Sequence, residues 1–558
     1  MQQQIMLNNR HTYIQIHPGD NVLVALTDLL QGSVVNYKGT ELILVNNIAA
    51  KHKFALQQLN PGDEIIMYGV LVGRASAFIP KGGGVTVNNI KHASEDFHLS
   101  DRKTAWSQPN VTAHQNKEFM GYHRPDGSVG TANYWLVIPL VFCENRNINV
   151  LKEALSAKLG FAEPRGYENE VDSLVEMYQT GKSVEEILNA DLRLTPDKQP
   201  SKKLFSNIDG IKFLNHELGC GGTRADSDAL CGLLAGYITH PNVAGATVLS
   251  LGCQHAQAQI LQAEIAMRDT AFSKPLVILE QQQLGTESRL LHEALKQTFA
   301  GLMQVNIQER KPAPLSKLCI GLECGGSDGF SGISANPALG YLSDILVSIG
   351  GSVILAEFPE LCGVEQDISD RCVNEATAQK FMHLMRTYNA RAEADGSGFY
   401  ANPSPGNIKD GLITDAIKSA GAAKKGGTSP VTAVLDYPEK VTKPGLNLLC
   451  TPGSDVESTT AEVAAGANIV LFTTGLGTPT GNPITPVIKL STNTKLYNKM
   501  PDIIDIDCGT IIEGEETIPQ AAERILQYVI SVASGLTQPK AVKLGQDDFI
   551  PWKRGVSL

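Results

Sequence analysis

Residues 318–358 read LCIGLECGGSDGFSGISANPALGYLSDILVSIGGSVILAEF, and this stretch decides the class of fold. Two short apolar runs, LCIGLEC and SVILAEF, enclose a helix-like segment, PALGYLSDILVSIGG. The succession of strand, helix and strand is typical of parallel sheets in α/β proteins. Cys324 is surrounded by five glycines, one within the first run, at position 321, and four after it, at positions 325, 326, 329 and 332. Such a cluster marks a place where the backbone closely approaches either a ligand or another backbone.

The same alternation extends in both directions from this stretch. Strand-like runs such as WLVIPLVF, ATVLSLG and PLVILE precede it, and LNLLCTP, NIVLFTTG and IIDIDCG follow it, with helix-like segments between them. The sequence KPAPLSK at residues 311–317 has the composition of a boundary. We therefore predict two doubly wound α/β domains, at residues 118–310 and 311–558.

The N-terminal part has a different pattern. Short β-rich runs between residues 12 and 90 are separated by PGD turns at residues 18–20 and 61–63. This spacing predicts a small, mostly antiparallel β domain, which we assign to residues 1–97. Residues 98–117 are polar and lack periodicity, which is typical of a linker.

Length, charge and hydropathy exclude several classes of partner and location. The chain has 558 residues, too many for one ordinary core, and a net charge of −11 without long runs of like charge. Nucleic acid is therefore a poor partner, and we expect a small molecule instead. The first residues have no signal-peptide pattern, and no apolar run is long enough to cross a membrane, so we expect a cytoplasmic protein without membrane contact.

Cysteines gather at the predicted strand ends. The chain has ten cysteines and no CxxC pair, which favours buried thiols, metal ligands or nucleophiles over disulfides. In parallel sheets, ligands bind at the carboxyl ends of strands. Next to glycine at such ends stand Cys220, Cys253, Cys324 and Cys508, and Cys143 follows another strand. This pattern predicts a polar crevice for a hydroxylated anion or a soft metal.

Two histidines of the small domain, His17 and His52, stand beside turns. A single histidine near a strand is usually structural, but two in one small domain, with Lys53 adjacent, raise the odds of a metal or acid/base role. Nucleotide-binding signatures are absent, because neither GCGGTRAD nor GLGTPTGN fits GxGxxG or GxxxxGK[ST]. No GxSxG elbow is present either, which disfavours acyl transfer.

Longer motifs extend over nearly the whole chain. Through these motifs and their order, the sequence resembles the altronate/galactarate dehydratase family of sugar-acid hydro-lyases, including its N-terminal SAF (β-clip) module. The stretches that carry the resemblance are IHPGDNVLVALTDLLQG (16–32), KHKFALQQLNPGDEIIMYGVLVGRA (51–75), GYHRPDGSVGTANYW (121–135), HELGCGG (216–222), HPNVAGATVLSLGC (240–253), GLECGGSDGFSGISANPALGYLSD (321–344), NPSPGNIKDGLIT (402–414), PGLNLLCTPGSD (444–455), LFTTGLGTPTGNPITPVIKLSTNT (471–494) and FIPWKRGVSL (549–558).

The resemblance implies a metal-dependent dehydration of a six-carbon sugar acid. Water is lost between C2 and C3 to give an enol, which becomes a 2-keto-3-deoxy acid. D-altronate, converted to 2-keto-3-deoxy-D-gluconate during hexuronate breakdown, is the substrate we expect. Galactarate is an alternative, as is elimination of sulfite from a sulfolactate-type acid. A sugar-acid-binding regulatory protein is the alternative without catalysis.

The resemblance also implies roles for individual residues and a cofactor. The implied ion is Fe²⁺ or Mn²⁺, an iron–sulfur centre is left open by the cysteines, and we expect a homodimer. His123 and Thr480 depart from the family pattern, which leaves the stereochemistry of the substrate open. The implied roles are metal binding for His17, His52, Cys220, Cys253 and Cys324, proton transfer for Lys53, His52 and Asp328, and substrate binding for Gly325, Gly326, Ser327, Asn336, Thr474 and Lys489.

Overall fold

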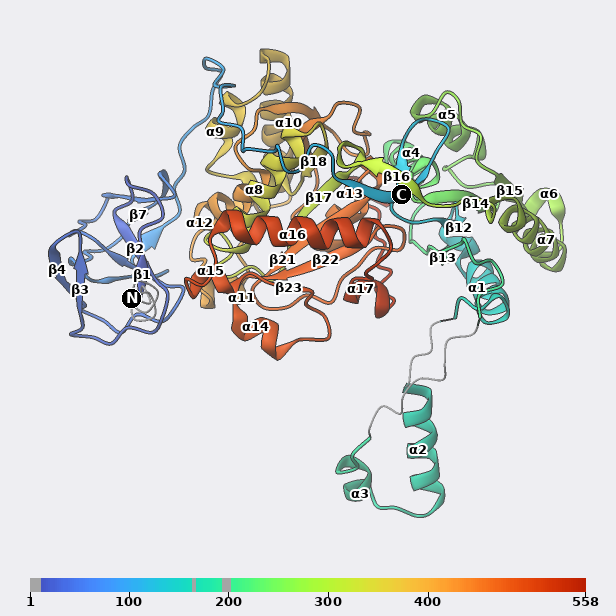
Figure 1. The fold of residues 1–558 in the computed structure, drawn as a ribbon, viewed down its shortest axis with the longest axis horizontal. Helices are drawn as coiled ribbons and strands as arrows, with labels where there is room; N and C mark the ends of the chain where they lie inside the picture. The colour runs from blue at the N-terminus through green and yellow to red at the C-terminus, as the bar shows by residue number, and fades with distance from the viewer. Residues whose placement is uncertain (1–11, 163–166, 193–201, 558) are drawn as a thin grey trace.

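The structure is a computed structural model that describes residues 12–162, 167–192 and 202–557. A small β domain and two α/β domains are arranged in a row, with the C-terminal α/β domain between the other two (Figure 1). Within the described residues, no helix is long and apolar enough to span a membrane.

The small domain consists of short antiparallel strands joined by tight turns. The predicted PGD turns lie at the starts of loops that lead into strands, where glycine supplies the positive φ at residue 62. Its strands are β1 (Tyr13–Ile14), β2 (Val22–Ala25), β5 (Lys53–Ala55) and β8 (Gly84–Val85) in one sheet, β6 (Glu64–Met67), β7 (Val70–Ala75) and β9 (Ile90–Lys91) in a second, and the hairpin of β3 (Val34–Tyr37) and β4 (Thr40–Ile43).

The second domain contains a parallel sheet in the order β13-β12-β14-β15. Its central strand β12 is buried at every position, which explains why the sequence there is continuously apolar. The strands are β12 (Tyr134–Pro139), β13 (Gly210–Phe213), β14 (Val243–Ser250) and β15 (Leu276–Glu280), and the longer helices are α1 (Asn145–Leu159), α2 (Tyr167–Gln179), α4 (Arg224–Thr239), α5 (Ala258–Arg268) and α7 (Glu287–Val305).

The C-terminal domain contains a seven-stranded parallel sheet in the order β19-β20-β18-β17-β21-β22-β23. The chain builds one side of the sheet outward from β17 and then returns to build the other side, so β17 lies at the topological switch point. The strands are β17 (Cys319–Cys324), β18 (Ser352–Leu355), β19 (Val431–Leu435), β20 (Gly445–Leu449), β21 (Ile469–Thr474), β22 (Val487–Ser491) and β23 (Ile506–Asp507).

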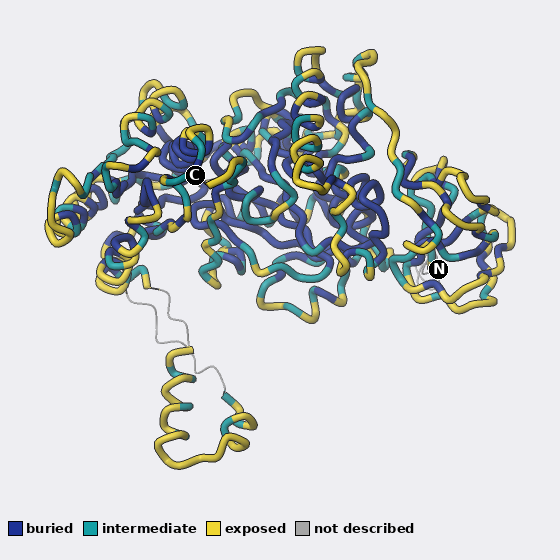
Figure 2. Tube along the Cα trace, turned by 180° about the vertical axis from the view of Figure 1, so that it is seen from behind, coloured by how far each residue is buried: buried dark blue, intermediate teal, exposed yellow. Residues whose placement is uncertain are grey.

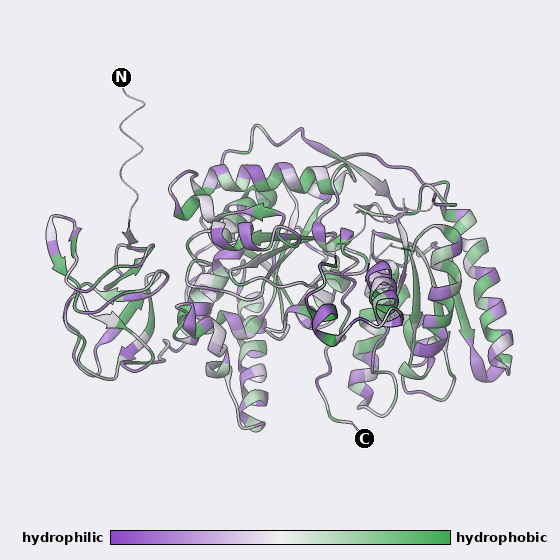
Figure 3. Cartoon of the chain, turned by 90° about the horizontal axis from the view of Figure 1, so that it is seen from below, coloured by the Kyte–Doolittle hydropathy of each residue, from purple (hydrophilic) through white to green (hydrophobic). Residues whose placement is uncertain are grey.

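Helices cover this sheet on both faces. The strands are buried almost throughout (Figure 2), while the surrounding helices carry both apolar and polar residues (Figure 3). The main helices are α8 (Ala335–Ser348), α10 (Glu375–Ala394), α12 (Asp415–Ala422), α13 (Asp455–Ala465) and α16 (Ile518–Ala533). The predicted fold class, a small β domain followed by two α/β domains with parallel sheets, is confirmed.

Three connections join the domains. Residues 92–117 contain no helix or strand and run along the C-terminal domain, where Lys103 donates to the Asp370 carbonyl. β10 (Glu118–His123) pairs with β16 (Lys311–Pro314), so the two ends of the second domain lie together. The C-terminal tail returns to the second domain, where the backbone N–H of Arg554 donates to Asp226.

Candidate active site

Three buried side chains of ligand type meet at the switch point of the C-terminal sheet. Cys324 is the last residue of β17, and Glu357 and Glu360 follow β18. The Cys324 sulfur lies 3.6 Å from a Glu357 oxygen and 3.2 Å from a Glu360 oxygen. All three offer ligand atoms within 4.8 Å of one another, and none is more than 2% exposed. We refer to these residues as the thiol–carboxylate cluster.

Two lysines offset the negative charge of this cluster. Lys425 Nζ lies 2.8 Å from the Cys324 sulfur and 2.7 Å from a Glu357 oxygen. Lys418 Nζ lies 2.6 Å from a Glu360 oxygen. Burial alone lowers the pKa of Lys425, but the surrounding thiol and carboxylates together raise it well above its usual value. Both lysines therefore stay protonated at neutral pH and are cations rather than bases.

Glu357 has an unusual backbone and an unused oxygen. Its φ and ψ of 60° place it in the left-handed region, which is rare for a residue with a side chain and is often found at functional sites. Its N–H donates to the Thr451 hydroxyl at 2.8 Å, which holds this conformation. In the part of the chain that the structure describes, Glu357 Oε1 has no hydrogen-bond partner. Burial, and then the neighbouring Glu360, raise the pKa of the Glu357 carboxyl.

The glycines after Cys324 are required by neighbouring loops. A Cβ at Gly325 would lie 2.0 Å from an oxygen of Asp455, the first residue of α13. Gly326 has a φ of 58°, and its carbonyl accepts a hydrogen bond from Gly475. The loops after β17, β20 and β21 therefore meet beside the thiol–carboxylate cluster. Asp455 is half-buried, and burial followed by Glu360 raises its pKa to about 6.

Asp328, a predicted catalytic residue, lies where the small domain contacts the C-terminal domain. Its carboxylate forms an ion pair with Lys51 at 3.0 Å and accepts hydrogen bonds from Thr492 and Asn493. Lys51 also pairs with Asp410 at 2.7 Å. Its partners are thus structural groups of the domain interface, and the lysine that reaches it is Lys51 rather than Lys53.

Lys53 and His52, the other predicted catalytic residues, also lie in this interface. Lys53 Nζ donates to the carbonyls of Lys51 and Gly411, and His52 Nε2 lies 3.1 Å from the Lys409 carbonyl. Burial lowers the pKa of Lys53 to about 7. These contacts join the two domains, and no contact of either residue with the thiol–carboxylate cluster is found among the described residues.

The predicted substrate-binding residues fall into two groups. Ser327 lies on the loop after β17, where its carbonyl accepts a hydrogen bond from Asn407, and Thr474 ends β21, where its hydroxyl accepts one from Gly477. Both side chains are buried. Their binding of substrate stays a prediction.

Asn336 and Lys489 are instead used inside the domain. Asn336 bonds to the Thr473 hydroxyl and the Gly421 carbonyl. Lys489 is completely buried within β22 and donates to the side chain of Gln546. Burial lowers the pKa of Lys489 to about 8. Neither side chain is free to meet a ligand in this conformation.

The five predicted metal ligands are distributed over all three domains. Cys324 groups with two glutamates in the C-terminal domain, whereas Cys220 and Cys253 lie in the second domain, on a different sheet. Strand-end position is shared by both sheets of the chain, so it could not tell which cysteines lie together. Among the described residues, neither His17 nor His52 belongs to a group of three ligands.

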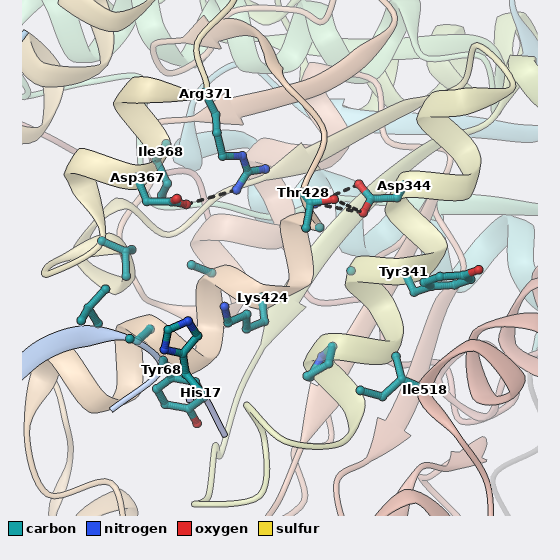
Figure 4. A pocket seen from close by; sticks show the side chains of 18 residues that line it. His17, Tyr68, Tyr341, Asp344, Asp367, Ile368, Arg371, Lys424, Thr428 and Ile518 are labelled. Carbon is teal, nitrogen blue, oxygen red and sulfur yellow. Dashed lines mark hydrogen bonds and ion pairs between the residues drawn. The ribbon is translucent and has the colours of Figure 1, made fainter. Parts of the chain in front are cut away.

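His17 lines a cavity of about 600 Å³ between the small and C-terminal domains (Figure 4). Tyr68 comes from the same domain, and Arg371 and Lys424 come from the C-terminal domain. Lys424 lies directly before Lys425 in the chain but lines this cavity instead of the thiol–carboxylate cluster. His17 Nδ1 accepts a hydrogen bond from Gly19.

Sequence reasoning did not select five residues of the site. Glu357, Glu360 and Asp455 follow strands, so the strand-end rule pointed to their segments, EFPELCG and TPGSDVESTT, without selecting the carboxylates. Lys418 and Lys425 lie on and directly after α12, far from any strand end. No sequence signal marks these lysines.

Comparison with known proteins covers the three parts of the chain separately. Residues 11–93 match the altronate/galactarate dehydratase SAF domain, and residues 121–306 match the second domain described for D-galactarate dehydratase/altronate hydrolase. Residues 315–557 match the C-terminal domain described for D-galactarate/altronate dehydratase.

Whole proteins are similar over nearly the full length. An altronate dehydratase from Bacillus subtilis (strain 168) is 34% identical over 98% of this chain and 100% of its own length. An altronate dehydratase from Escherichia coli (strain K12) is 33% identical over 94% of this chain and 95% of its own. A galactarate dehydratase (L-threo-forming) from the same strain is 32% identical over 94% and 93%. The chain therefore belongs to the altronate/galactarate dehydratase family, as the motifs predicted.

Proposed function

We propose that this hydro-lyase converts D-altronate to 2-keto-3-deoxy-D-gluconate in hexuronate breakdown. Two altronate dehydratases align with nearly the whole chain, which supports this substrate. The observation that carries the proposal is the buried set of thiol, carboxylates and lysines at the switch point of the sheet, where α/β proteins bind their ligands.

The reaction requires proton transfer and charge stabilisation. C2 loses a proton, C3 loses its hydroxyl as water after that oxygen is protonated, and the enol tautomerises to the ketone. The proton at C2 is only weakly acidic, so the negative charge that develops on the carboxylate must be stabilised. The protonated Lys418 and Lys425 supply positive charge at the cluster.

Asp455 is the carboxylate best placed for proton transfer. It is half-buried beside Gly325, whereas Glu357 and Glu360 are almost fully buried beneath the glycine loop. Asp455 is therefore the most accessible of the three carboxylates. The alternative assignment to Lys53, His52 or Asp328 stays a prediction, and the interface contacts of these residues weigh against it.

The thiol–carboxylate cluster fits a divalent Fe²⁺ or Mn²⁺ ion. Cys324, Glu357 and Glu360 would hold it, since thiolate and carboxylate ligands suit these ions. The unused oxygen of Glu357 is consistent with a missing ligand. When bound, such an ion polarises the carboxylate and hydroxyl oxygens of the substrate as a Lewis acid.

The test is turnover of defined acids by protein reconstituted anaerobically with Fe²⁺ or Mn²⁺. We expect 2-keto-3-deoxy-D-gluconate from D-altronate, loss of activity in Glu360→Gln, and wild-type activity in Glu393→Gln, which changes an exposed carboxylate on α10. Galactarate and sulfolactate are assayed in parallel, the latter by sulfite release. Product from galactarate or sulfolactate but not altronate would reassign the substrate. Ligand binding without any turnover would instead support the regulatory alternative.

A further inference from the structure

Three cysteines of the second domain lie at one edge of its sheet. Cys143 follows β12, Cys220 follows β13 and Cys253 follows β14. β12 lies between the other two strands and pairs with both in parallel, so the three loops leave the sheet at the same edge. We refer to these residues as the three-cysteine edge.

Backbone hydrogen bonds join the three loops. The N–H of Phe142 donates to the Leu218 carbonyl at 3.0 Å, which brings the Cys143 loop against the Cys220 loop. The N–H of Ala256 donates to the Gly219 carbonyl at 3.2 Å, which does the same for the Cys253 loop.

Gly219 makes this close approach possible. Its φ of 99° favours glycine, and a Cβ there would lie 2.4 Å from the Leu140 carbonyl. The residue before Cys220 therefore rests directly on the end of β12. Gly252, the residue before Cys253, has a φ of 126°. Each turn thus requires glycine next to its cysteine.

The three thiols are accessible to solvent. Cys143, Cys220 and Cys253 are exposed, unlike the other cysteines of the chain, which are buried or intermediate. Exposed cysteines are readily oxidised, and a bound ligand would protect three thiols that share one edge.

The three thiols do not all lie within 4.8 Å of one another, which is wider than a single ion requires. Around a single tetrahedral ion with bonds of about 2.3 Å, sulfur atoms would lie roughly 3.8 Å apart. The residues that the structure describes include two groups whose ligand atoms lie within 4.8 Å, and the three-cysteine edge is not one of them. In an iron–sulfur cluster each thiolate binds a different iron, so the sulfur atoms lie farther apart.

We propose that Cys143, Cys220 and Cys253 bind a [4Fe–4S] cluster. Three thiolates serve three of its irons, and the fourth iron has no cysteine ligand from this edge. That iron is open to an oxygen ligand such as a hydroxyl or carboxylate. The inference concerns the second domain and stands whichever sugar acid the enzyme uses.

The domain of the proposed cluster packs against the C-terminal domain through α4 and α13. α4 starts just after Cys220 and α13 just after the loop that follows β20. A Cβ at Gly236, near the end of α4, would lie 2.4 Å from the carbonyl of Ala464, near the end of α13. The two helices therefore pack closely near their carboxyl-terminal ends.

The test uses full-length protein reconstituted anaerobically with ferrous iron and sulfide. We expect a brown protein with absorbance at about 400 nm, about four sulfides per chain, and about four irons per chain beyond any single ion held by the thiol–carboxylate cluster. Each of Cys143→Ser, Cys220→Ser and Cys253→Ser should lower the sulfide content at least about fivefold. Cys324→Ser, at the other site, and Cys231→Ser, at a buried cysteine of the same domain, should keep it. Circular dichroism confirms that each variant is folded.

Two results would overturn the proposal. One is a colourless protein that binds a single zinc ion lost from the same three variants. The other is a sulfide content that these variants leave unchanged. Either result leaves the proposed dehydration intact, and failure to dehydrate altronate leaves the cluster assignment intact, because iron and sulfide are measured without substrate.

Discussion

The thiol–carboxylate cluster and the three-cysteine edge arise from the same local sequence pattern but have opposite surroundings. In both, a cysteine ends or follows a parallel strand, and Cys324, Cys220 and Cys253 each stand next to glycine. Cys324 is 2% exposed, and burial raises its pKa well above the usual value. Cys220 and Cys253 are exposed. The strand end fixes where a thiol lies, whereas the elements packed around it decide its charge and its accessibility.

The covering elements explain the difference. Above β17, the loops after three strands and two lysines close over the thiol, and the small domain packs on the adjoining loop through Lys51. At the edge of the second-domain sheet, three loops bond to one another and leave their thiols outside. The first region is suited to fixed charges in a low dielectric and the second to a ligand acquired from solution.

The largest effect should follow from removing a carboxylate of the thiol–carboxylate cluster. We expect Glu357→Gln to lower kcat at least about a thousandfold, since it removes a charge at the proposed catalytic centre. Steady-state kinetics with altronate measure this loss, with Glu393→Gln as the exposed control. Near-normal turnover of Glu357→Gln would move the active site elsewhere.

The next largest effect should be on the free energy of unfolding, which a substitution should lower more in the thiol–carboxylate cluster than at the three-cysteine edge. Lys425→Met leaves buried acidic groups without their cation, which should cost about 3 to 5 kcal/mol of the free energy of unfolding. Cys220→Ser in the cluster-free protein should change it by less than about 0.5 kcal/mol. Lys424→Met, at the neighbouring exposed lysine, is the matched control in urea unfolding. An equal loss of unfolding free energy in Lys425→Met and Lys424→Met would contradict the burial of Lys425 among acidic groups.

The pH dependence of stability should distinguish Lys53 from Lys425. Both are buried, but in the described part of the chain Lys53 has no carboxylate at hydrogen-bonding distance. Lys53 has a folded pKa of about 7, below its unfolded value. Between these values the unfolded chain holds a proton that the folded chain lacks, so stability rises with pH. From pH 6 to 9, the wild type should gain about 2 to 3 kcal/mol relative to Lys53→Met.

The control for this experiment is Lys91→Met, which removes an exposed lysine of the same small domain. Its unfolding free energy should follow the wild type across the pH range. A wild-type gain no larger than that of Lys53→Met would show that Lys53 is not buried as a neutral amine near pH 8.

Thiol labelling should show the smallest effect. In native protein without metal or cluster, iodoacetamide should modify Cys143, Cys220 and Cys253 at least about tenfold faster than Cys324, because the thiolate must form and be reached. Peptide mass spectrometry measures each rate. Equal rates would mean that the glycine loop opens readily over the buried thiol.

Much of the fold could be predicted from sequence because parallel strands buried on both faces are continuously apolar, as in β12 and β17. The switch-point loop around Cys324 was found for the same reason. The partners of Cys324 were not, because Lys418 and Lys425 come from a distant segment and have no local pattern. His52 and Lys53 form hydrogen bonds across a domain interface, which no local pattern reveals.

The pairing of β10 with β16 has a consequence for how this chain can be built. These strands lead into and out of the second domain, and they lie side by side with Phe119 opposite Ala313. A domain whose two ends meet can be inserted or removed without rerouting the remaining chain. The second domain is therefore an insertion between β10 and β16, and the contact of Arg554 with Asp226 is one of several that hold it against the C-terminal domain.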